Sequence, residues 1–365
     1  MFKLITNLPR LVLFAGVLLA NSSLHAQQAA KALPSLPPLP EYPAVTQIDA
    51  NTSGEIYFQS TNPGDYKQLV LADQPSPDIT VKALLTLPNN ATAEHPVSAM
   101  VILHGSGGIL PSRELDYAKW LAGQGVATMV IDTYAARGVT EQTPYGLRVA
   151  IVSDADEVAD AYAALKLLNQ HPLINHNKIG VMGFSYGGMA TRAALDKRIY
   201  QNLANGVAPF ALHVDFYGPC HFSLQSEHTT GAPYFSFRGA EDASNDLARC
   251  AKVEQHIRQT GSTAGSHIFA NAGHGWEMTT ERKFVATLNP APCEQLLTPE
   301  GNWQLNGKLI EMPDNSDATI QFQTRLQLLG QMKQSCMSEG YIMGKDNVTH
   351  VQSNKMLFEL IQRYL

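Results

Sequence analysis

Two hydrophobic patterns alternate along the chain: short continuous apolar runs and longer stretches with helical spacing. Residues 126–132 (VATMVID) are almost continuously apolar, which is typical of a strand covered on both faces. Residues 154–169 instead place apolar side chains on one face and acidic ones in the first turn, which predicts a helix. The same patterns predict further strands at 55–60, 79–87, 96–103, 178–182, 211–217, 233–238 and 266–270, and further helices at 113–121, 187–203, 247–259 and 355–365.

This alternation of strands and helices predicts an α/β fold with a mostly parallel central sheet flanked by helices on both faces. We expect one domain over residues 54–365. A Pro-rich arm at 27–53 precedes it, as a tether or an arm on the domain surface. Residues 285–320 break the rhythm with several prolines and a hairpin pattern at 302–312, so we expect an insertion there.

The N-terminal residues have the pattern of a secretory signal peptide, at 1–26. Lys3 and Arg10 lead into an apolar run at 11–20, and a polar, small-residue stretch ends at Ala26. The run is too short to span a bilayer as a helix, so no stable membrane insertion of the mature chain is expected. An uncleaved anchor is the alternative interpretation. Export to the periplasm or the medium follows from cleavage.

Composition adds less to this interpretation. The 365 residues are 44% hydrophobic and 16% charged, as in globular proteins. The net charge is −6 without a basic cluster, which argues against a nucleic-acid partner, and nothing in the sequence indicates an oligomeric state.

The four cysteines show no metal-site spacing, so no structural metal is expected. Export would permit disulfides, and four cysteines allow three pairings. Cys220 follows one predicted core strand and Cys250 lies in the helix after the next, which favours a Cys220–Cys250 bridge and leaves Cys293 with Cys336.

The strongest chemical motif is GFSYGG at 183–188, a G-x-S-x-G match between an apolar strand and an apolar helix. This context places a serine on a tight turn as a nucleophile, so Ser185 is the candidate. A glycine-rich turn with a surface serine is the alternative.

The sequence HGSGG at 104–108 ends another apolar strand and suggests an oxyanion hole. One backbone donor would be the amide of Tyr186, after the nucleophile. The other would be the amide of Ser106, with Gly105 and Gly107 as alternatives. A phosphate-binding loop fits poorly, because neither GxGxxG nor a P-loop lysine is present.

A serine nucleophile needs a base, and His274 in NAGHGW (271–276) follows the last predicted strand, where active-site loops gather. His221, on another loop, is the main competitor. His213 and His267 fall within predicted strands and are interpreted as structural.

A carboxylate must orient the base, and the GAED sequence at 239–242 follows the preceding strand. Asp242 is the first candidate, Glu241 the second and Asp246 the third. The order Ser185, Asp242, His274 is that of α/β hydrolases, unlike the chymotrypsin or subtilisin orders.

Together HGSGG, IDTYAARG, GFSYGG, RGAED and AGHGW resemble the dienelactone hydrolase branch of the α/β hydrolases, from about residue 79 to the C-terminus. The resemblance implies a hydrolase of small esters or lactones that needs no metal or organic cofactor. Its triad positions fall on Ser185, Asp242 and His274. The founding members use a cysteine nucleophile, so the serine favours a more general carboxylesterase.

Three further residues are candidates for substrate binding. Arg137, in the loop after residues 126–132, would clamp a substrate carboxylate, or else it only fixes the loop. Tyr134 and Trp276, with Tyr186, would line an apolar pocket unless they are ordinary core residues.

The sequence thus predicts a serine hydrolase acting on esters or lactones through an acyl-enzyme. An acyltransferase or peptidase with the same triad, or a catalytically silent binding protein, are the alternatives.

Overall fold

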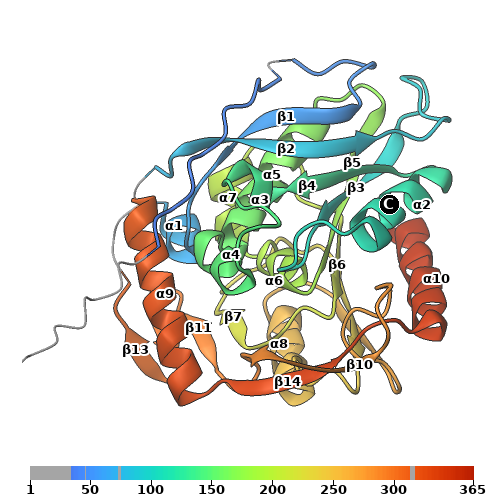
Figure 1. Cartoon of the computed structure of the whole chain (residues 1–365). Helices are drawn as coiled ribbons and strands as arrows, with labels where there is room; N and C mark the ends of the chain where they lie inside the picture. The colour runs from blue at the N-terminus through green and yellow to red at the C-terminus, as the bar shows by residue number, and fades with distance from the viewer. Residues whose placement is uncertain (1–33, 46, 73–74, 313–316) are drawn as a thin grey trace, which may run out of the picture. The chain divides into compact units, whose positions relative to one another are not determined.

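The structure, a computed structural model, describes residues 34–45, 47–72, 75–312 and 317–365. The chain divides into two units, Met1–Pro34 and Ser35–Leu365. The second unit holds the helices and strands labelled in Figure 1. The predicted signal peptide lies outside the described residues.

An eight-stranded sheet forms the centre of this unit, in the order β1-β2-β4-β3-β5-β6-β8-β9. Its first strands, β1 and β2, pair antiparallel with each other, and β2 is also antiparallel to β4. All other neighbours in the sheet are parallel, which confirms the predicted mostly parallel sheet. The strands are β1 Gly54–Thr61, β2 Asp78–Thr86, β3 Val97–Leu103, β4 Ala127–Asp132, β5 Ile174–Phe184, β6 Leu212–Phe216, β8 Tyr234–Gly239 and β9 Ala264–Phe269.

Helices cover both faces of the sheet, as expected, because side chains along each strand alternate between the faces. On β3, Val101 packs in one buried cluster and Met100 in the other. The first cluster includes side chains of α1 (Tyr66–Leu71), α5 (Asp154–Leu168), α6 (Tyr186–Ala193) and α7 (Lys197–Ala204). The second includes side chains of α2 (Asp116–Gly123) and α10 (Asn347–Tyr364). The remaining helices include α3 (Thr133–Ala136), α4 (Tyr145–Ile151) and α8 (Leu247–Gln259).

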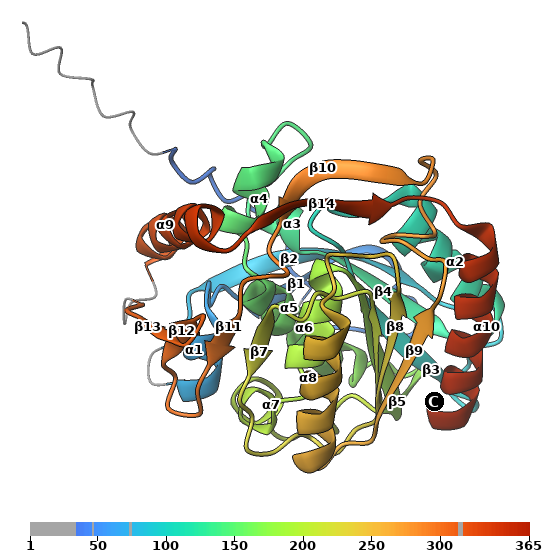
Figure 2. The ribbon, with the colours of Figure 1, turned by 90° about the horizontal axis from the view of Figure 1, so that it is seen from below.

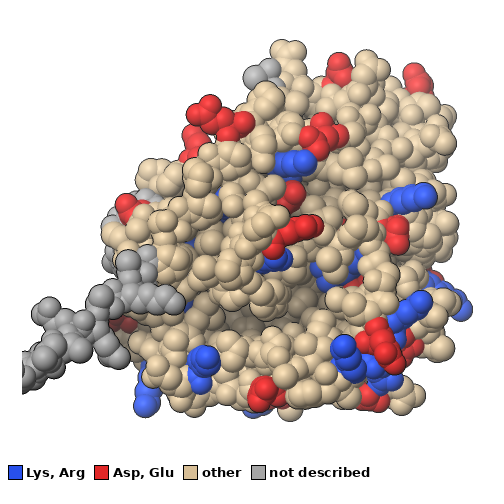
Figure 3. Space-filling view, in the orientation of Figure 1, with Lys and Arg blue, Asp and Glu red and all other residues tan. Residues whose placement is uncertain are grey.

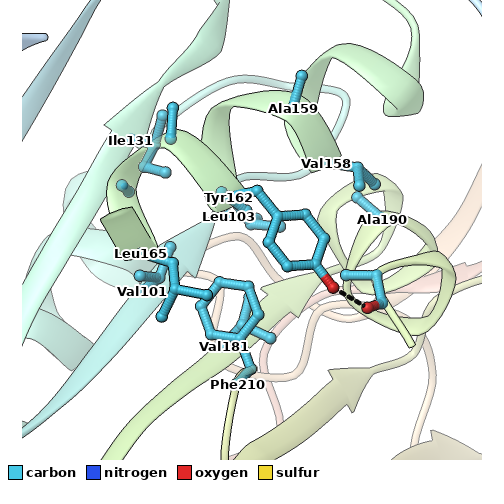
Figure 4. Packing of buried hydrophobic residues seen from close by; sticks show 14 of the residues in the cluster. Val101, Leu103, Ile131, Val158, Ala159, Tyr162, Leu165, Val181, Ala190 and Phe210 are labelled. Carbon is cyan, nitrogen blue, oxygen red and sulfur yellow. Dashed lines mark hydrogen bonds between the residues drawn. The ribbon is translucent and has the colours of Figure 1, made fainter. Parts of the chain in front are cut away.

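Helix α5 packs against the sheet through buried hydrophobic side chains (Figure 4). Val158, Tyr162 and Leu165 pack with side chains of the sheet, and the Tyr162 hydroxyl donates to the Ala194 carbonyl at 2.5 Å. At its start, Ser153 and Asp156 form a capping box, so α5 begins at Asp154.

Three predicted helices differ in their bounds. The helix expected at 187–203 is two helices, because Asp196 accepts a hydrogen bond from the Arg198 amide and starts α7 anew. The last helix begins earlier than predicted, since Asp346 caps α10. The helix expected at 113–121 starts as a π-helical turn, Pro111–Leu115, that continues into α2.

The segment after the main sheet forms its own small structures (Figure 2). Strands β10 (Lys283–Asn289) and β14 (Ser338–Met343) pair antiparallel, and a second small sheet has the order β13-β12-β11-β7. Its strands are β7 Phe222–Leu224, β11 Gln295–Leu297, β12 Trp303–Leu305 and β13 Lys308–Ile310. The predicted hairpin is present: β12 and β13 join over Asn306 and Gly307, whose positive φ angles suit a tight hairpin turn. The helix α9 (Ala318–Ser335) was not predicted.

Two disulfides tie loops to this framework. Cys220 pairs with Cys250 (S–S 2.14 Å) and Cys293 with Cys336 (2.04 Å), so the favoured pairing is confirmed. The second bond joins the chain after β10 to the end of α9.

The described part of the Pro-rich arm lies along β1. The Val45 amide donates to the Tyr57 carbonyl at 2.7 Å, and the Tyr42 and Tyr57 rings stack at 4.6 Å. Among the described helices, none combines the length and apolarity that crossing a membrane requires. Acidic and basic side chains are interspersed on the hollowed face that Figure 3 shows.

Candidate active site

Ser185 lies on a sharp turn between β5 and α6, at the carboxyl end of the parallel strands. Its φ is 55°, a rare angle for a residue with a side chain, and its amide donates to the Phe216 carbonyl at 2.8 Å. The flanking glycines have no room for a Cβ. At Gly183 it would lie 2.1 Å from the Gly187 carbonyl oxygen, and at Gly187 2.6 Å from that of Leu103. The G-x-S-x-G spacing is therefore a steric requirement of this turn.

A continuous chain of hydrogen bonds joins Ser185, His274 and Asp242. The distance from Ser185 Oγ to His274 Nε2 is 2.9 Å, and that from His274 Nδ1 to Asp242 Oδ2 is 2.7 Å. The His274 loop is held by its own amide, which donates to the Ile342 carbonyl of β14 at 2.8 Å. The structure thus brings the three predicted residues together.

Two neighbours that the sequence reasoning missed bind the Asp242 carboxylate. Oδ1 accepts from the Ser244 amide (3.0 Å) and hydroxyl (2.6 Å), and Oδ2 accepts from Asn245 Nδ2 at 2.9 Å. Burial alone would raise the pKa of Asp242, but the charge of His274 and these hydrogen bonds outweigh it and lower the pKa. Asp242 is therefore ionised. A serine and an asparagine two and three residues after an aspartate are typical of such local turns. This spacing in the sequence could have predicted that Ser244 and Asn245 bind Asp242.

The other candidate acids have partners elsewhere. Glu241 forms an ion pair with Arg282. Asp246 caps α8 by accepting from the Arg249 amide at 3.0 Å. Neither makes a hydrogen bond to His274 within the described residues.

The other candidate histidines are poor bases. His221 borders the same cavity as Ser185, but burial and the nearby Arg192 and Arg249 lower its pKa to about 3. His213 is buried on β6 and bonds a backbone carbonyl, as expected of a structural histidine.

The glycine-rich turn lies beside the nucleophile and is firmly held. Residues 105–108 form a turn closed by a 2.8 Å backbone hydrogen bond, and the Ser106 carbonyl accepts from the Tyr134 hydroxyl at 3.1 Å. Arg148 donates to the carbonyl of residue 107 at 2.8 Å. Tyr186 is the first residue of α6, so its amide has no acceptor within the helix. Among the described residues the Ser106 amide shows no hydrogen bond, so both predicted donors are available.

Arg137 does not reach the cavity, so its assignment to substrate binding is corrected. Its guanidinium is buried, with Nη1 2.8 Å from Asp160 Oδ2 and Nε 2.7 Å from Asn62 Oδ1. Because Asp160 of α5 and Asn62 after β1 hold its guanidinium, Arg137 fixes its loop, which was the alternative interpretation.

Tyr134 and Trp276 are likewise structural. Trp276 is fully buried and donates from Nε1 to Ser353 Oγ of α10 at 3.0 Å. Tyr134 packs on the His104 ring, with 4.4 Å between centroids, and supports the turn described above. Neither lines the cavity, whereas Tyr186 does.

A cavity of about 380 Å³ opens beside Ser185 and His274. One wall comes from the aromatic side chains Tyr66, Phe222 and Trp303, and another from α9. The α9 residues lining it include Leu328, Leu329, Met332 and Lys333. The sequence reasoning assigned none of these residues to the site. Within the described ranges, no cluster of three or more His, Cys, Asp and Glu side chains is arranged to hold a metal.

Comparisons with known proteins identify the family of the chain. A family model, the dienelactone hydrolase family, matches residues 81–294. A relative from Bradyrhizobium sp., named "Probable 2-oxo-3-(5-oxofuran-2-ylidene)propanoate lactonase", is 21% identical over 193 residues, which cover 49% of this chain and 72% of the relative.

Among solved structures, one assigned to a dienelactone hydrolase of Klebsiella pneumoniae is 20% identical, with a TM-score of 0.44, covering 61% of this chain and 88% of that one. The butyrate-bound esterase Est2 of Thermogutta terrifontis is 16% identical, with a TM-score of 0.43, covering 59% and 84%. Since the family model matches more than half of the chain, this protein belongs to the dienelactone hydrolase family and is a carboxylic ester hydrolase.

Proposed function

We propose that this protein hydrolyses carboxylic esters or lactones with Ser185 as nucleophile, His274 as general base and Asp242 as the acid that orients the base. The observation that carries the proposal is the unbroken chain of hydrogen bonds through these three side chains, 2.9 Å and 2.7 Å long. The ionised Asp242 would hold a proton on His274 Nδ1, which leaves Nε2 as the acceptor that Ser185 needs.

In the first half of the reaction, Ser185 Oγ attacks the substrate carbonyl carbon while its proton passes to His274 Nε2. The resulting oxyanion accepts hydrogen bonds from the Tyr186 and Ser106 amides. The carbon–oxygen bond to the alcohol then breaks, the alcohol oxygen takes the proton from Nε2, and an acyl-enzyme remains.

In the second half, a water gives one proton to His274 Nε2 and its oxygen bonds to the acyl carbon. Ser185 Oγ leaves with that proton, and the carboxylic acid is released. In a lactone the alcohol stays attached to the acyl group and leaves with it.

A fluorophosphonate probe tests the nucleophile. We expect the probe to label Ser185 in the folded protein, the Ser185→Ala variant to lose both label and esterase activity, and Ser338→Ala, at an exposed serine, to keep both. A label mapped to another residue, or its absence from folded wild-type protein, would refute the assignment.

We also propose that the protein is exported, with residues 1–26 as a cleaved signal peptide, to the periplasm or the medium. The two disulfides support this, because such bonds persist in oxidising compartments. Mass determination of the protein recovered from each cell fraction tests it: full-length chain in the cytoplasm with free thiols would contradict export.

A further inference from the structure

The proposed mechanism gives the cavity two sides. His274 must protonate the departing alcohol, so the alcohol points toward His274 and the acyl group points away from it. Tyr341 lies on the His274 side, with 5.2 Å between the two ring centroids. Met189 lies one helical turn beyond Ser185, where its amide donates to the Ser185 carbonyl at 3.1 Å. Met189 also borders the cavity, and the acyl side is assigned to it.

Flat aromatic rings form the wall of the acyl side. Met189 belongs to the same buried cluster as Tyr66, Phe222 and Trp303. The Tyr66 and Phe222 rings stack at 4.7 Å with 23° between their planes, and the Phe222 and Trp303 rings follow at 5.2 Å and 32°. Because Trp303 Nε1 donates to Asp65 Oδ1 at 2.9 Å, the wall is fixed in position. Aromatic faces held in this way suit a flat apolar group.

Two carboxyl groups interrupt this apolar lining: Asp65, which already accepts from Trp303, and Asp154. Asp154, the first residue of α5, borders the cavity and accepts a hydrogen bond from the Tyr66 hydroxyl at 3.0 Å. It lies two residues beyond Val152, whose carbonyl accepts from the Tyr186 hydroxyl at 3.1 Å, so the Tyr186 side chain spans from the nucleophile toward it.

A carboxylate can accept about four hydrogen bonds, and the Tyr66 hydroxyl supplies one. Burial raises the pKa of Asp154 to about 7, which shows that its ionised form is poorly solvated and would gain from another donor. A plain hydrocarbon chain in the cavity would remove water from this carboxyl and return no hydrogen bond.

Building on the proposed function, we propose that the acyl side of the cavity selects esters whose acyl group carries a hydroxylated aromatic ring. The ring lies against Tyr66 and Phe222, and its hydroxyl donates to Asp154. The volume of about 380 Å³ is within the range of small-molecule sites and suffices for one such ring. Asp154 is thus assigned as a specificity-determining residue.

The test compares methyl esters that share one alcohol: 3-phenylpropanoate, its 3-hydroxyphenyl and 4-hydroxyphenyl analogues, and hexanoate. We expect kcat/KM for one hydroxyphenyl ester to exceed that of the phenyl ester by about tenfold or more, the range of a hydrogen bond to a charged acceptor. In Asp154→Ala this ratio should fall toward one. The Tyr66→Phe variant keeps the aromatic ring of the wall but removes the hydroxyl that donates to Asp154. The ratio of kcat/KM between the hydroxyphenyl and phenyl esters should therefore persist in it.

Several outcomes overturn the proposal: no preference for either hydroxyphenyl ester in the wild type, a preference that survives in Asp154→Ala, or hexanoate as the best substrate. These results remain separable from failure of the proposed function. If Ser185 were not the nucleophile, the fluorophosphonate probe would miss it and Ser185→Ala would still hydrolyse all four esters.

Discussion

At the scale of single residues, the adjacent acids Glu241 and Asp242 show how the backbone divides two similar side chains. Asp242 is buried and bonds His274, whereas Glu241 faces Arg282 at the surface. Only one of the two carboxylates is therefore placed to fix the imidazole tautomer of the base.

We expect Asp242→Asn to lower kcat by up to about four orders of magnitude, the effect of the equivalent change in a serine protease, because the amide favours the wrong tautomer of His274. Glu241→Gln should change kcat little. Both variants are assayed on one ester, with circular dichroism to confirm folding. Near-normal turnover by Asp242→Asn beside a crippled Glu241→Gln would transfer the role to Glu241.

The site residues found from sequence were those whose motif is local. Ser185 and His274 each follow a recognisable strand within a short glycine-bearing stretch. The role of Arg137 was misjudged because its partner Asp160 comes from another element, and no local sequence pattern predicts such an ion pair. Tyr66 and Trp303 escaped notice for the same reason: Phe222, whose ring contacts both of theirs, is far from both in sequence.

At the scale of elements, the turn between β5 and α6 depends on close approach of its backbone to β3. The Gly187→Ala variant would put a methyl group 2.6 Å from the Leu103 carbonyl and 2.8 Å from that of His104. Either α6 or the glycine-rich turn must then move, and both proposed oxyanion donors, the Tyr186 and Ser106 amides, belong to these segments.

For Gly187→Ala we therefore expect a large loss of kcat/KM and a fall of roughly 2–4 kcal/mol in the free energy of unfolding, as for other strained substitutions. Gly123→Ala is the matched control, because a methyl group at this position of α2 would meet open space. It should keep both the kcat/KM and the free energy of unfolding of the wild type. Urea unfolding and ester hydrolysis measure the two quantities. Wild-type activity in Gly187→Ala would mean that the turn tolerates displacement.

Hydrophobic periodicity predicted the central strands well because both faces of the sheet are covered. It failed where a polar residue starts a new helix, as Asp196 does by capping α7 shortly after α6 ends. It also missed α9, although Phe322, Leu326 and Leu329 have helical spacing and pack against α4. The prolines just before α9 made the whole segment look irregular.

At the scale of the whole described unit, the cavity combines three stretches of the chain: residues 64–66, residues of the family match and residues after it. Ser185 and His274 lie within the residues matched by the family model, while Trp303 and the α9 wall come after them. The Cys293–Cys336 bond fastens the end of α9 to the chain beside β10, and Met332 and Met337 of the cavity wall flank Cys336.

Removing this bond in Cys293→Ser/Cys336→Ser should lower the free energy of unfolding by about 4 kcal/mol in the loop-entropy model. It should also change the ratio of kcat/KM between the phenylpropanoate and hexanoate esters, because the α9 wall loses its anchor. Cys220→Ser/Cys250→Ser, which removes the other bond, should lose a similar amount of stability and is the control for stability alone, because Cys220 lies two residues before Phe222 of the aromatic wall. An unaltered ratio in the first variant would show that packing alone holds α9.

The contribution of a late stretch of sequence to the cavity makes the protein partly modular from an engineering standpoint. Ser185 and His274 follow strands of the main sheet, whereas Trp303 and the α9 wall belong to a later cassette, residues 295–337, which the Cys293–Cys336 bond fastens to the rest of the chain. A chimaera that exchanges this cassette for that of a relative would present the same Ser185 and His274 to a differently shaped chamber. Part of the substrate range would then be transplantable, while the reaction and the contacts of Asp154, Tyr66 and Phe222 stay with the recipient.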